Sequence, residues 1–267
     1  MITAVDVGGT KTLIAQFGDR LQPQNELRFE TPKAPDQFIL LLQQHLSRLG
    51  NTEALTLGVP GIVLPDGTVV RCANLPWHDF HLKQRLAELY DCPIYIQNDA
   101  KLAALAEINS LSPVPALGLY LTIGTGIGTG IIVDGKLVPA LANAEGGHTT
   151  IWDGEQWQVW EHVASGRALS AHFGKLVSEL SEQNEWQYVA DRLALGLYSL
   201  IPTFQPQVVV VGGGAGKHFE QFREPLGELL QERISSYIKL PELRGAQHSE
   251  EAVLYGAYYY VRHQQLI

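Results

Sequence analysis

A repeated pattern of strand, glycine-rich turn and strand constrains the fold of this chain more than any other feature. The first copy occupies residues 2–17 and contains the turn Gly8-Gly9-Thr10-Lys11. The second copy occupies residues 117–133 and contains the turn Gly124-Thr125-Gly126. When Gly8 is aligned with Gly124, the two copies stay in register without a gap. We therefore predict a duplicated α/β domain.

Both turns are suited to binding an anion. Their Gly and Thr residues leave several backbone N–H groups uncovered, and concave turns of this kind bind phosphate groups. Neither turn is a Walker loop, because the Gly-Lys-Ser/Thr ending is absent and a strand is expected to follow. Gly-Gly is also a common hairpin turn, so a purely structural role stays open on these residues alone.

The charge and composition of the chain argue against several classes of protein. The formal net charge is -9 and no Lys/Arg-rich run is present, which argues against nucleic-acid binding. No stretch of about eighteen apolar residues occurs, so we expect no membrane span. The N-terminus lacks a signal-peptide pattern, and Cys72 and Cys92 fit neither a disulfide framework nor a metal knuckle. We therefore expect a cytoplasmic protein.

The length of 267 residues and a Ser/Pro-rich segment at residues 110–115 predict two domains. We place the first domain at residues 1–112 and the second at residues 113–267. A final helix, from about residue 249 to residue 263, is a candidate to pack back on the first domain.

Asp99 stands where a strand ends and a helix begins. The run Pro93–Ile96 is typical of a strand, and Ala and Leu residues recur at helical spacing after Asp99. Asp at this position is most simply an N-cap. The alternative is a carboxylate that accepts a proton from a substrate hydroxyl, because ligands bind at this edge of an open α/β sheet. The stretch itself does not decide between the two.

Three other stretches combine polar residues or glycines in loops. The loop Asn74–Trp77 carries an amide and an indole, which suits a bound sugar and a packed loop equally. Glu145-Gly-Gly-His148 places a carboxylate and an imidazole around two glycines. Gly212-Gly213-Gly214 follows a buried-type strand and precedes a helical pattern, so a phosphate or a flat ligand can approach the backbone there.

Taken together, these motifs resemble those of the ROK family of sugar kinases, within the actin/hexokinase/Hsp70-like ATPase fold. The resemblance covers nearly the whole chain and implies two duplicated ribonuclease-H-like domains with an active-site cleft between them. The matching segments, in the order of the family, are Asp6-Val-Gly-Gly-Thr-Lys11, Gly58-Val-Pro-Gly61, Asn98-Asp99-Ala100, Gly124-Thr-Gly-Ile-Gly128, Glu145-Gly-Gly-His148, Glu161 ahead of Ala-Ser-Gly-Arg, and Gly212-Gly-Gly214.

The resemblance implies a role for each of these motifs. Asp99 looks like the general base that faces the sugar hydroxyl, and Asp6 looks like the carboxylate that orients hydrated Mg²⁺. Further residues look like ligands of the sugar hydroxyls: Asn74, Asn98, Glu145, His148 and Glu161, together with Asp99. Ten residues look like the binding loops for the phosphates and the adenosine of ATP: Gly8, Gly9, Thr10, Lys11, Gly124, Thr125, Gly126, Gly212, Gly213 and Gly214.

The chain departs from the family after His148. Many members carry a zinc knuckle of closely spaced cysteines there, but residues 149–161 contain no cysteine, so we expect no structural zinc. We expect a cluster of Trp152, Trp157 and Trp160 to hold His148 and Glu161 in place instead. Polyphosphate-using glucokinases related to the family also lack the knuckle, which leaves the phosphoryl donor open.

The resemblance implies an ATP- and Mg²⁺-dependent kinase that phosphorylates a hexose, most simply the 6-OH of glucose. The alternatives are a kinase of N-acetylmannosamine, N-acetylglucosamine or fructose, a polyphosphate-dependent glucokinase, and a non-catalytic ROK-type sugar sensor. Repressors of the family carry an N-terminal helix-turn-helix, whereas here the first predicted strand begins at residue 2. The expected partners are a sugar and ATP. A homodimer is expected as well, because members of the family often form dimers.

Overall fold

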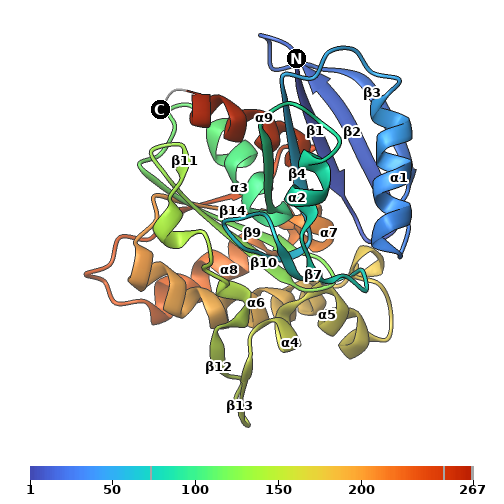
Figure 1. The fold of residues 1–267 in the computed structure, drawn as a ribbon. Helices are drawn as coiled ribbons and strands as arrows, with labels where there is room; N and C mark the ends of the chain where they lie inside the picture. Colours follow the sequence, from blue (N-terminus) through green and yellow to red (C-terminus); the bar gives the residue numbers. More distant parts are fainter. Residues whose placement is uncertain (73, 249, 266–267) are drawn as a thin grey trace. The chain divides into compact units, whose positions relative to one another are not determined.

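The computed structural model describes residues 1–72, 74–248 and 250–265, and it divides into two compact units (Figure 1). The first unit comprises Met1–Ala106 and Glu250–Ile267, and the second comprises Glu107–Ser249. The change of unit therefore falls within helix α3 (Asp99–Asn109), ahead of the expected boundary at residue 112. Helix α9 (Ala252–Gln265) belongs to the first unit.

The first unit is built on a five-stranded sheet with the order β3-β2-β1-β4-β8. Strand β2 is antiparallel to both β1 and β3, whereas β4 and β8 continue the sheet in parallel with β1. The bounds of these strands are β1 Ile2–Val7, β2 Lys11–Phe17, β3 Pro23–Glu30, β4 Ala54–Val59 and β8 Ile94–Asn98.

Helices cover both faces of this sheet (Figure 1). Helix α1 (Pro35–Leu46) buries Phe38 and Leu42 against the face that presents Val5 and Val7. The opposite face packs against Leu102 of α3 and Leu254 of α9. Successive side chains of a strand point to opposite faces, so the nearly continuous apolar runs of β1 and β4 are those of strands buried on both sides.

A small sheet of β5 (Gly61–Val63), β6 (Val69–Cys72) and β7 (His78–Phe80) precedes helix α2 (Leu82–Ala87). The indole of Trp77 is fully buried beside it, packs on Phe38 and Phe80, and donates from Nε1 to the carbonyl oxygen of Lys33 at 2.9 Å. Trp77 is therefore a core residue, and the sugar-facing role considered for this indole is wrong. Asn74, in the same loop, is exposed.

The second unit repeats the sheet of the first. Its strand order is β11-β10-β9-β14-β15, with β10 antiparallel to both β9 and β11 and with β14 and β15 parallel to β9. The same order and directions confirm the predicted duplication. The bounds are β9 Leu117–Ile123, β10 Ile127–Val133, β11 Lys136–Leu137, β14 Val208–Gly212 and β15 Glu242–Gly245.

The gap-free alignment of the two copies, however, is wrong by one residue beyond the turn. Val7 pairs with Thr12 in the first hairpin, whereas Ile123 pairs with Ile127 in the second. The second turn is thus one residue shorter, closed by a hydrogen bond from Gly124 N to Gly126 O at 3.0 Å. Glycine allows the tighter turn because it lacks a Cβ, and the sequence alone shows no sign of the shift.

The other elements of the second unit pack on this sheet or extend from it. A long helix, α6, and helix α8 bury apolar residues in the core. The elements are η1 Pro139–Leu141, η2 Gly146–His148, β12 Thr150–Trp152, β13 Trp157–Val159, α4 Glu161–Ala164, α5 Gly166–Phe173, η3 Val177–Glu179, α6 Gln183–Phe204, α7 Gly213–Gly216 and α8 Phe219–Arg233.

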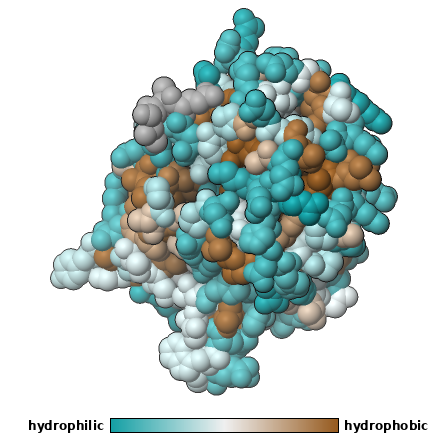
Figure 2. Space-filling model, viewed as in Figure 1, coloured by the Kyte–Doolittle hydropathy of each residue, from teal (hydrophilic) through white to brown (hydrophobic). Residues whose placement is uncertain are grey.

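Among the described residues, no helix is both long and apolar enough to cross a membrane. Hydrophobic residues emerge in separate patches on the face drawn in Figure 2, with hydrophilic residues between them. Scattered patches of this kind are ordinary for a protein surface.

Candidate functional site

Two adjacent polar residues at the junction of β8 and α3, Asn98 and Asp99, have different roles. Asn98 accepts from the backbone N–H of Lys101 at 3.0 Å through Oδ1, and its Nδ2 donates to the carbonyl oxygen of Gly61 at 2.9 Å. These bonds make Asn98 the N-cap of α3. Asp99 is the first residue of the helix, and its Oδ1 accepts from the N–H of Ala100 at 2.7 Å. The capping role considered for Asp99 therefore belongs to Asn98.

Asp6 on β1 is electrostatically coupled to Asp99. The pKa of Asp6 is raised to about 7, first by burial and then by the negative charge of Asp99, whereas the ammonium group of Lys11 lowers it. The parallel strands explain the proximity: Asp6 pairs with Gly58, and Gly58 pairs with Gln97, two residues before Asp99. The structure thus brings together two carboxylates that lie far apart in the sequence.

Gly58 is a site residue whose role the sequence patterns did not reveal. A Cβ at this position would collide with Cγ1 of Val253 and lie 3.6 Å from Cα of Asp99. The missing side chain therefore lets α9 and the start of α3 approach the sheet beside Asp6. The only signal in the sequence was the Gly58–Gly61 motif itself.

The first turn, Gly8–Lys11, is fixed by bonds to its carbonyl oxygens. Gly8 N donates to Lys11 O at 2.9 Å, and Thr31 N donates to Thr10 O at 2.9 Å. Lys33 places Nζ 2.8 Å from the carbonyl oxygen of Gly9, a second residue that sequence reasoning missed. The side chain of Asn74 lies against Gly9, because a Cβ there would be 2.6 Å from Cβ of Asn74.

The ammonium group of Lys11 is paired within the first unit. Its Nζ lies 2.7 Å from Oε2 of Glu250, and both side chains are more than half exposed. An exposed pair of this kind adds little to stability. It therefore leaves the Lys11 ammonium able to exchange Glu250 for another anion.

The second turn and the glycine-rich loop after β14 meet at one cavity of about 580 Å³ in the second unit. Gly124 and Thr125 line it together with Gly214, and their contact with a nucleotide stays a prediction. The remaining lining residues come from the end of β9, from α5, from η3 and the residue before it, from α7 and from the residues after α7: Ile123, Gly166, Arg167, Ser170, Leu176, Val177, Ser178, Ala215, Lys217 and His218.

Three of the predicted glycines of this unit, Gly126, Gly212 and Gly213, do not line this cavity. Gly213 has φ +79, and a Cβ there would lie 2.6 Å from the backbone nitrogen of Ile123. A Cβ at Gly212 would lie 2.5 Å from the hydroxyl oxygen of Tyr120. These two glycines allow close packing of β14 and α7 on β9, and their direct contact with a nucleotide stays a prediction.

The Glu145–His148 segment lies on the first residues of β10. Gly146 N donates to Oγ1 of Thr129 at 2.8 Å, and a Cβ at Gly147 would collide with the carbonyl oxygen of Ile127. Both glycines therefore serve this close approach. The segment ends in His148, whose Nε2 lies 3.9 Å from Oε1 of Glu161.

Glu161, the first residue of α4, connects this segment to the second turn. Its Oε2 accepts from the backbone N–H of Ile127 at 3.3 Å, and a Cβ at Gly126 would lie 2.5 Å from the same oxygen. The structure thus brings together Glu161, His148 and Gly126, which the sequence separates. The carboxylate beside an imidazole offers acceptors and a donor for paired hydroxyl groups.

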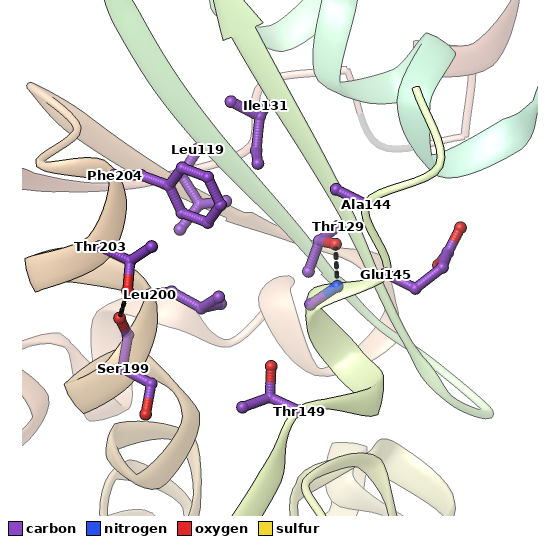
Figure 3. A pocket seen from close by; sticks show the side chains of 11 residues that line it. Leu119, Thr129, Ile131, Ala144, Glu145, Thr149, Ser199, Leu200, Thr203 and Phe204 are labelled. Carbon is purple, nitrogen blue, oxygen red and sulfur yellow. Dashed lines mark hydrogen bonds between the residues drawn. The ribbon is translucent and has the colours of Figure 1, made fainter. Parts of the chain in front are cut away.

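A second cavity, of about 320 Å³, lies behind the Glu145–Thr149 segment (Figure 3). Leu119, Leu200 and Phe204 form its hydrophobic wall, and Figure 3 shows the carboxylate of Glu145 pointing away from that wall. Glu145 is itself one of the lining residues, opposite the hydrophobic wall (Figure 3).

No group of three or more His, Cys, Asp or Glu side chains able to hold a metal ion occurs among the residues that the structure describes.

Two sheets of the same topology, each with a glycine-rich turn after its first strand, define the class as the actin/hexokinase-like fold. The chain belongs to the ROK family, because the model of that family matches residues 2–264.

Similar proteins include kinases and a regulator. A putative fructokinase of Bacillus subtilis (strain 168) is 28% identical over 262 residues, which cover 91% of this chain and 86% of the relative. A xylose repressor of Caldicellulosiruptor bescii is 30% identical over 243 residues, which cover 75% of this chain. The match spans 60% of the repressor's own length.

Solved structures agree with the family. A ROK hexokinase from Thermus thermophilus superposes with a TM-score of 0.82 at 27% identity and covers 100% of this chain and 99% of its own. A ROK family glucokinase from Streptomyces griseus, solved with glucose and AMPPNP, superposes with a TM-score of 0.78 at 23% identity. It covers 96% of this chain and 97% of its own, and at this identity the likeness concerns the fold.

Proposed function

We propose that this chain is an ATP-dependent sugar kinase that transfers a phosphoryl group to a hydroxyl of a hexose, most simply the 6-OH of glucose. The proposal rests on the different roles of Asn98 and Asp99 at the junction of β8 and α3. Because Asn98 caps α3, Asp99 is not needed as the cap, and its negative charge raises the pKa of Asp6. A paired carboxylate site at a strand–helix junction is typical of a catalytic centre.

In this proposal Asp99 is the general base. Its carboxylate accepts the proton of the attacking sugar hydroxyl while the oxygen forms a bond to the γ-phosphorus and ADP leaves. A positioned base contributes about 10²–10⁴-fold to such a reaction. The N–H of Ala100, which donates to one carboxylate oxygen at 2.7 Å, holds the carboxylate in one orientation.

We assign the sugar hydroxyls to Asn74, Asn98, Glu145, His148 and Glu161. Glu161 and His148 support this assignment, because their side chains lie 3.9 Å apart and together accept and donate. Asn98 already bonds to two backbone groups through its amide, so its contribution would come from the second N–H of Nδ2 or from the second lone pair of Oδ1. A site built from such groups rejects analogues that lack a hydroxyl, because its own polar atoms then stay unpaired.

The donor is assigned from the cavity beside the second turn. Ile123, Leu176, Val177 and Ala215 give this cavity hydrophobic walls, which suit the flat purine ring of ATP. A linear polyphosphate has no apolar part to fill them. The glucokinase of the same fold that was solved with AMPPNP and glucose agrees with a nucleotide donor.

Asp6 fits a site for Mg²⁺. Carboxylate oxygens are the ligands that Mg²⁺ prefers, and a cation beside Asp6 would offset the burial and the Asp99 charge that raise its pKa to about 7. When bound, Mg²⁺ would neutralise charge on the donor phosphates. The protein supplies the carboxylate and, in Lys11, an ammonium group near it.

The fructokinase relative makes fructose a second acceptor to examine, and the repressor relative makes sugar sensing without turnover a second function. N-acetylmannosamine and N-acetylglucosamine complete the set of acceptors. The two functions differ in whether the bound sugar is converted.

The test is a phosphoryl-transfer screen of the purified protein. It crosses glucose, fructose, mannose, N-acetylglucosamine and N-acetylmannosamine with ATP-Mg²⁺ and with polyphosphate, and Asp99→Asn serves as the inactive control. One strong pair with ATP supports the proposal, and a strong pair with polyphosphate refutes the donor. Absence of turnover together with thermal stabilisation by a sugar would replace the kinase with a sensor.

A further inference from the structure

Helix α6 presents a row of residues spaced four apart: Tyr188, Arg192, Gly196 and Leu200. Residues with this spacing are neighbours on a helix surface. Three of them contact the segment that runs from Gly146 to Trp160. A Cβ at Gly146 would lie 3.2 Å from Cδ1 of Leu200, and Nη1 of Arg192 donates to the carbonyl oxygen of Asp153 at 3.3 Å.

Gly196 receives the indole of Trp160. The indole is fully buried, and its Nε1 donates to the carbonyl oxygen of Arg192 at 3.0 Å. A Cβ at Gly196 would collide with three atoms of the indole ring. Glycine is among the poorest helix formers, so its presence inside the 22-residue helix α6 is explained by the ring that occupies this space.

Arg192 stabilises the contact between α6 and the segment that carries Trp160. Its guanidinium carbon lies 5.1 Å from the centroid of the Tyr188 ring, and it also pairs with Asp191. The arginine is thereby held in the orientation that meets Asp153 at the start of the hairpin turn. One face of α6 thus holds the hairpin through Arg192 and Trp160 through Gly196.

The hairpin β12–β13 separates His148 from Glu161 in the sequence and sets their spacing. Trp160 N donates to Thr149 O at 2.9 Å, which closes the base of the hairpin. Thr149 directly follows His148, and Trp160 directly precedes Glu161. Because the Trp160 ring is held on α6, the backbone position from which the Glu161 side chain extends is held as well.

The three tryptophans of this segment do not form the single cluster that we expected. The hairpin of β12 and β13 extends from its unit (Figure 1). Trp152 and Trp157 pair across this hairpin, with ring centroids 5.7 Å apart. They are 49% and 69% exposed. The three indoles are equally hydrophobic, so residue type alone did not distinguish them. The difference is that Trp160 fills the space left by Gly196.

We propose that Trp160 and Gly196 position Glu161, together with His148, for sugar binding. The inference rests on the proposed function, because it assigns Glu161 and His148 to the sugar. Trp160 is a positioning residue: it touches neither substrate nor reacting atoms, and it acts through the residue that follows it. Movement of the ring would shift the carboxylate away from Ile127 and His148.

The test compares two glycines that both lie inside helices. Gly196→Ala inserts a methyl group into the space of the Trp160 ring, whereas Gly227→Ala in α8 meets no atom within 4 Å. We expect Gly196→Ala to raise the sugar KM about 10- to 100-fold, the usual cost of a misplaced contact, with the nucleotide KM nearly unchanged. Gly227→Ala and Trp157→Ala should keep both constants near wild type.

A double variant separates positioning from general damage. Trp160→Leu makes room at residue 196, so Gly196→Ala should cost far less in the Trp160→Leu background than alone, a non-additivity expected of residues in contact. Trp160→Phe keeps a ring over Gly196 and provides a folded variant if Gly196→Ala does not fold. It should raise the sugar KM less than Trp160→Leu does.

Two outcomes would overturn the inference. One is an active Gly196→Ala enzyme whose sugar KM matches that of Gly227→Ala, and the other is an equal rise of the sugar and nucleotide KM values. A failure of the proposed function looks different, because the wild type itself would then show no turnover with any sugar.

Discussion

Replacing Asp6 by Asn should make the protein more stable at neutral pH while it abolishes activity. Asp6 is half-buried, and the pKa of its carboxyl group is raised to about 7 by desolvation and by the charge of Asp99. Asn has nearly the same shape and no charge to desolvate. The variant therefore removes the cost of ionisation and, in the proposed function, the carboxylate that would orient Mg²⁺.

The sign and the size of the effect follow from the pKa of Asp6. Between about pH 3.8 and about pH 7, Asp6 holds a proton in the folded state that it has released in the unfolded state. The free energy of unfolding therefore falls as the pH rises. The contribution of the protonated group is fully present below about pH 4 and is lost through about pH 7. At about 1.4 kcal/mol for each pH unit, the whole effect amounts to about 4 kcal/mol.

Urea denaturation of wild type and Asp6→Asn, at several values between about pH 5 and about pH 8, measures this difference. The free energies of unfolding should lie closest at the lowest pH and should diverge toward about 4 kcal/mol at the highest, with Asn the more stable. Comparing the two proteins at each pH cancels the titration of every group that does not interact with Asp6, so the difference reports on Asp6 together with its neighbours Asp99 and Lys11.

Asp66→Asn is the matched control. The pKa of Asp66 is lowered by hydrogen bonds from Thr68, so its contribution is present above its unfolded pKa and is lost only as the pH falls below about 4. Its difference from wild type should stay flat across the assay range. Parallel pH profiles for wild type and Asp6→Asn would refute the reasoning, since they would mean that Asp6 ionises normally in the folded state.

Asp99→Asn should lower turnover about 10²–10⁴-fold while sugar-dependent thermal stabilisation persists, and turnover near wild type would remove Asp99 from the proposed mechanism. Trp77→Ala should lower the free energy of unfolding, measured in urea, by about 3–5 kcal/mol, because it empties a fully buried site. Trp157→Ala should change the same free energy by no more than about 0.5 kcal/mol, and equal losses would contradict the burial argument. Mg²⁺ at about pH 8 should raise the melting temperature of wild type more than that of Asp6→Asn, and EDTA should reverse the rise; an equal rise in both would place the ion elsewhere.

Local patterns predicted much of the fold. The strand–turn–strand repeat indicated duplication because glycine turns and apolar runs are short-range signals. The helices and strands that carry the motifs occur where these patterns placed them, including α3 directly after β8. The one-residue difference between the two turns left no such signal, because glycine accommodates either length.

The assignment of roles within the site needed tertiary contacts. Asn98 and Asp99 are adjacent and are equally good caps, so only the hydrogen bond from Lys101 N to Asn98 identified the cap. The coupling of Asp6 to Asp99 depends on the parallel pairing of β1, β4 and β8. Such pairing joins distant segments, and no local pattern encodes their distance.

The sequence by itself determined the repeat, the order of the motifs and the absence of cysteine between residues 149 and 161. Only the tertiary structure decided that Trp77 and Trp160 are buried while Trp157 is exposed. The physical reason is that a side chain's burial depends on the space its neighbours leave. Gly196, which leaves that space for Trp160, is an ordinary glycine until the helix and the hairpin are brought together.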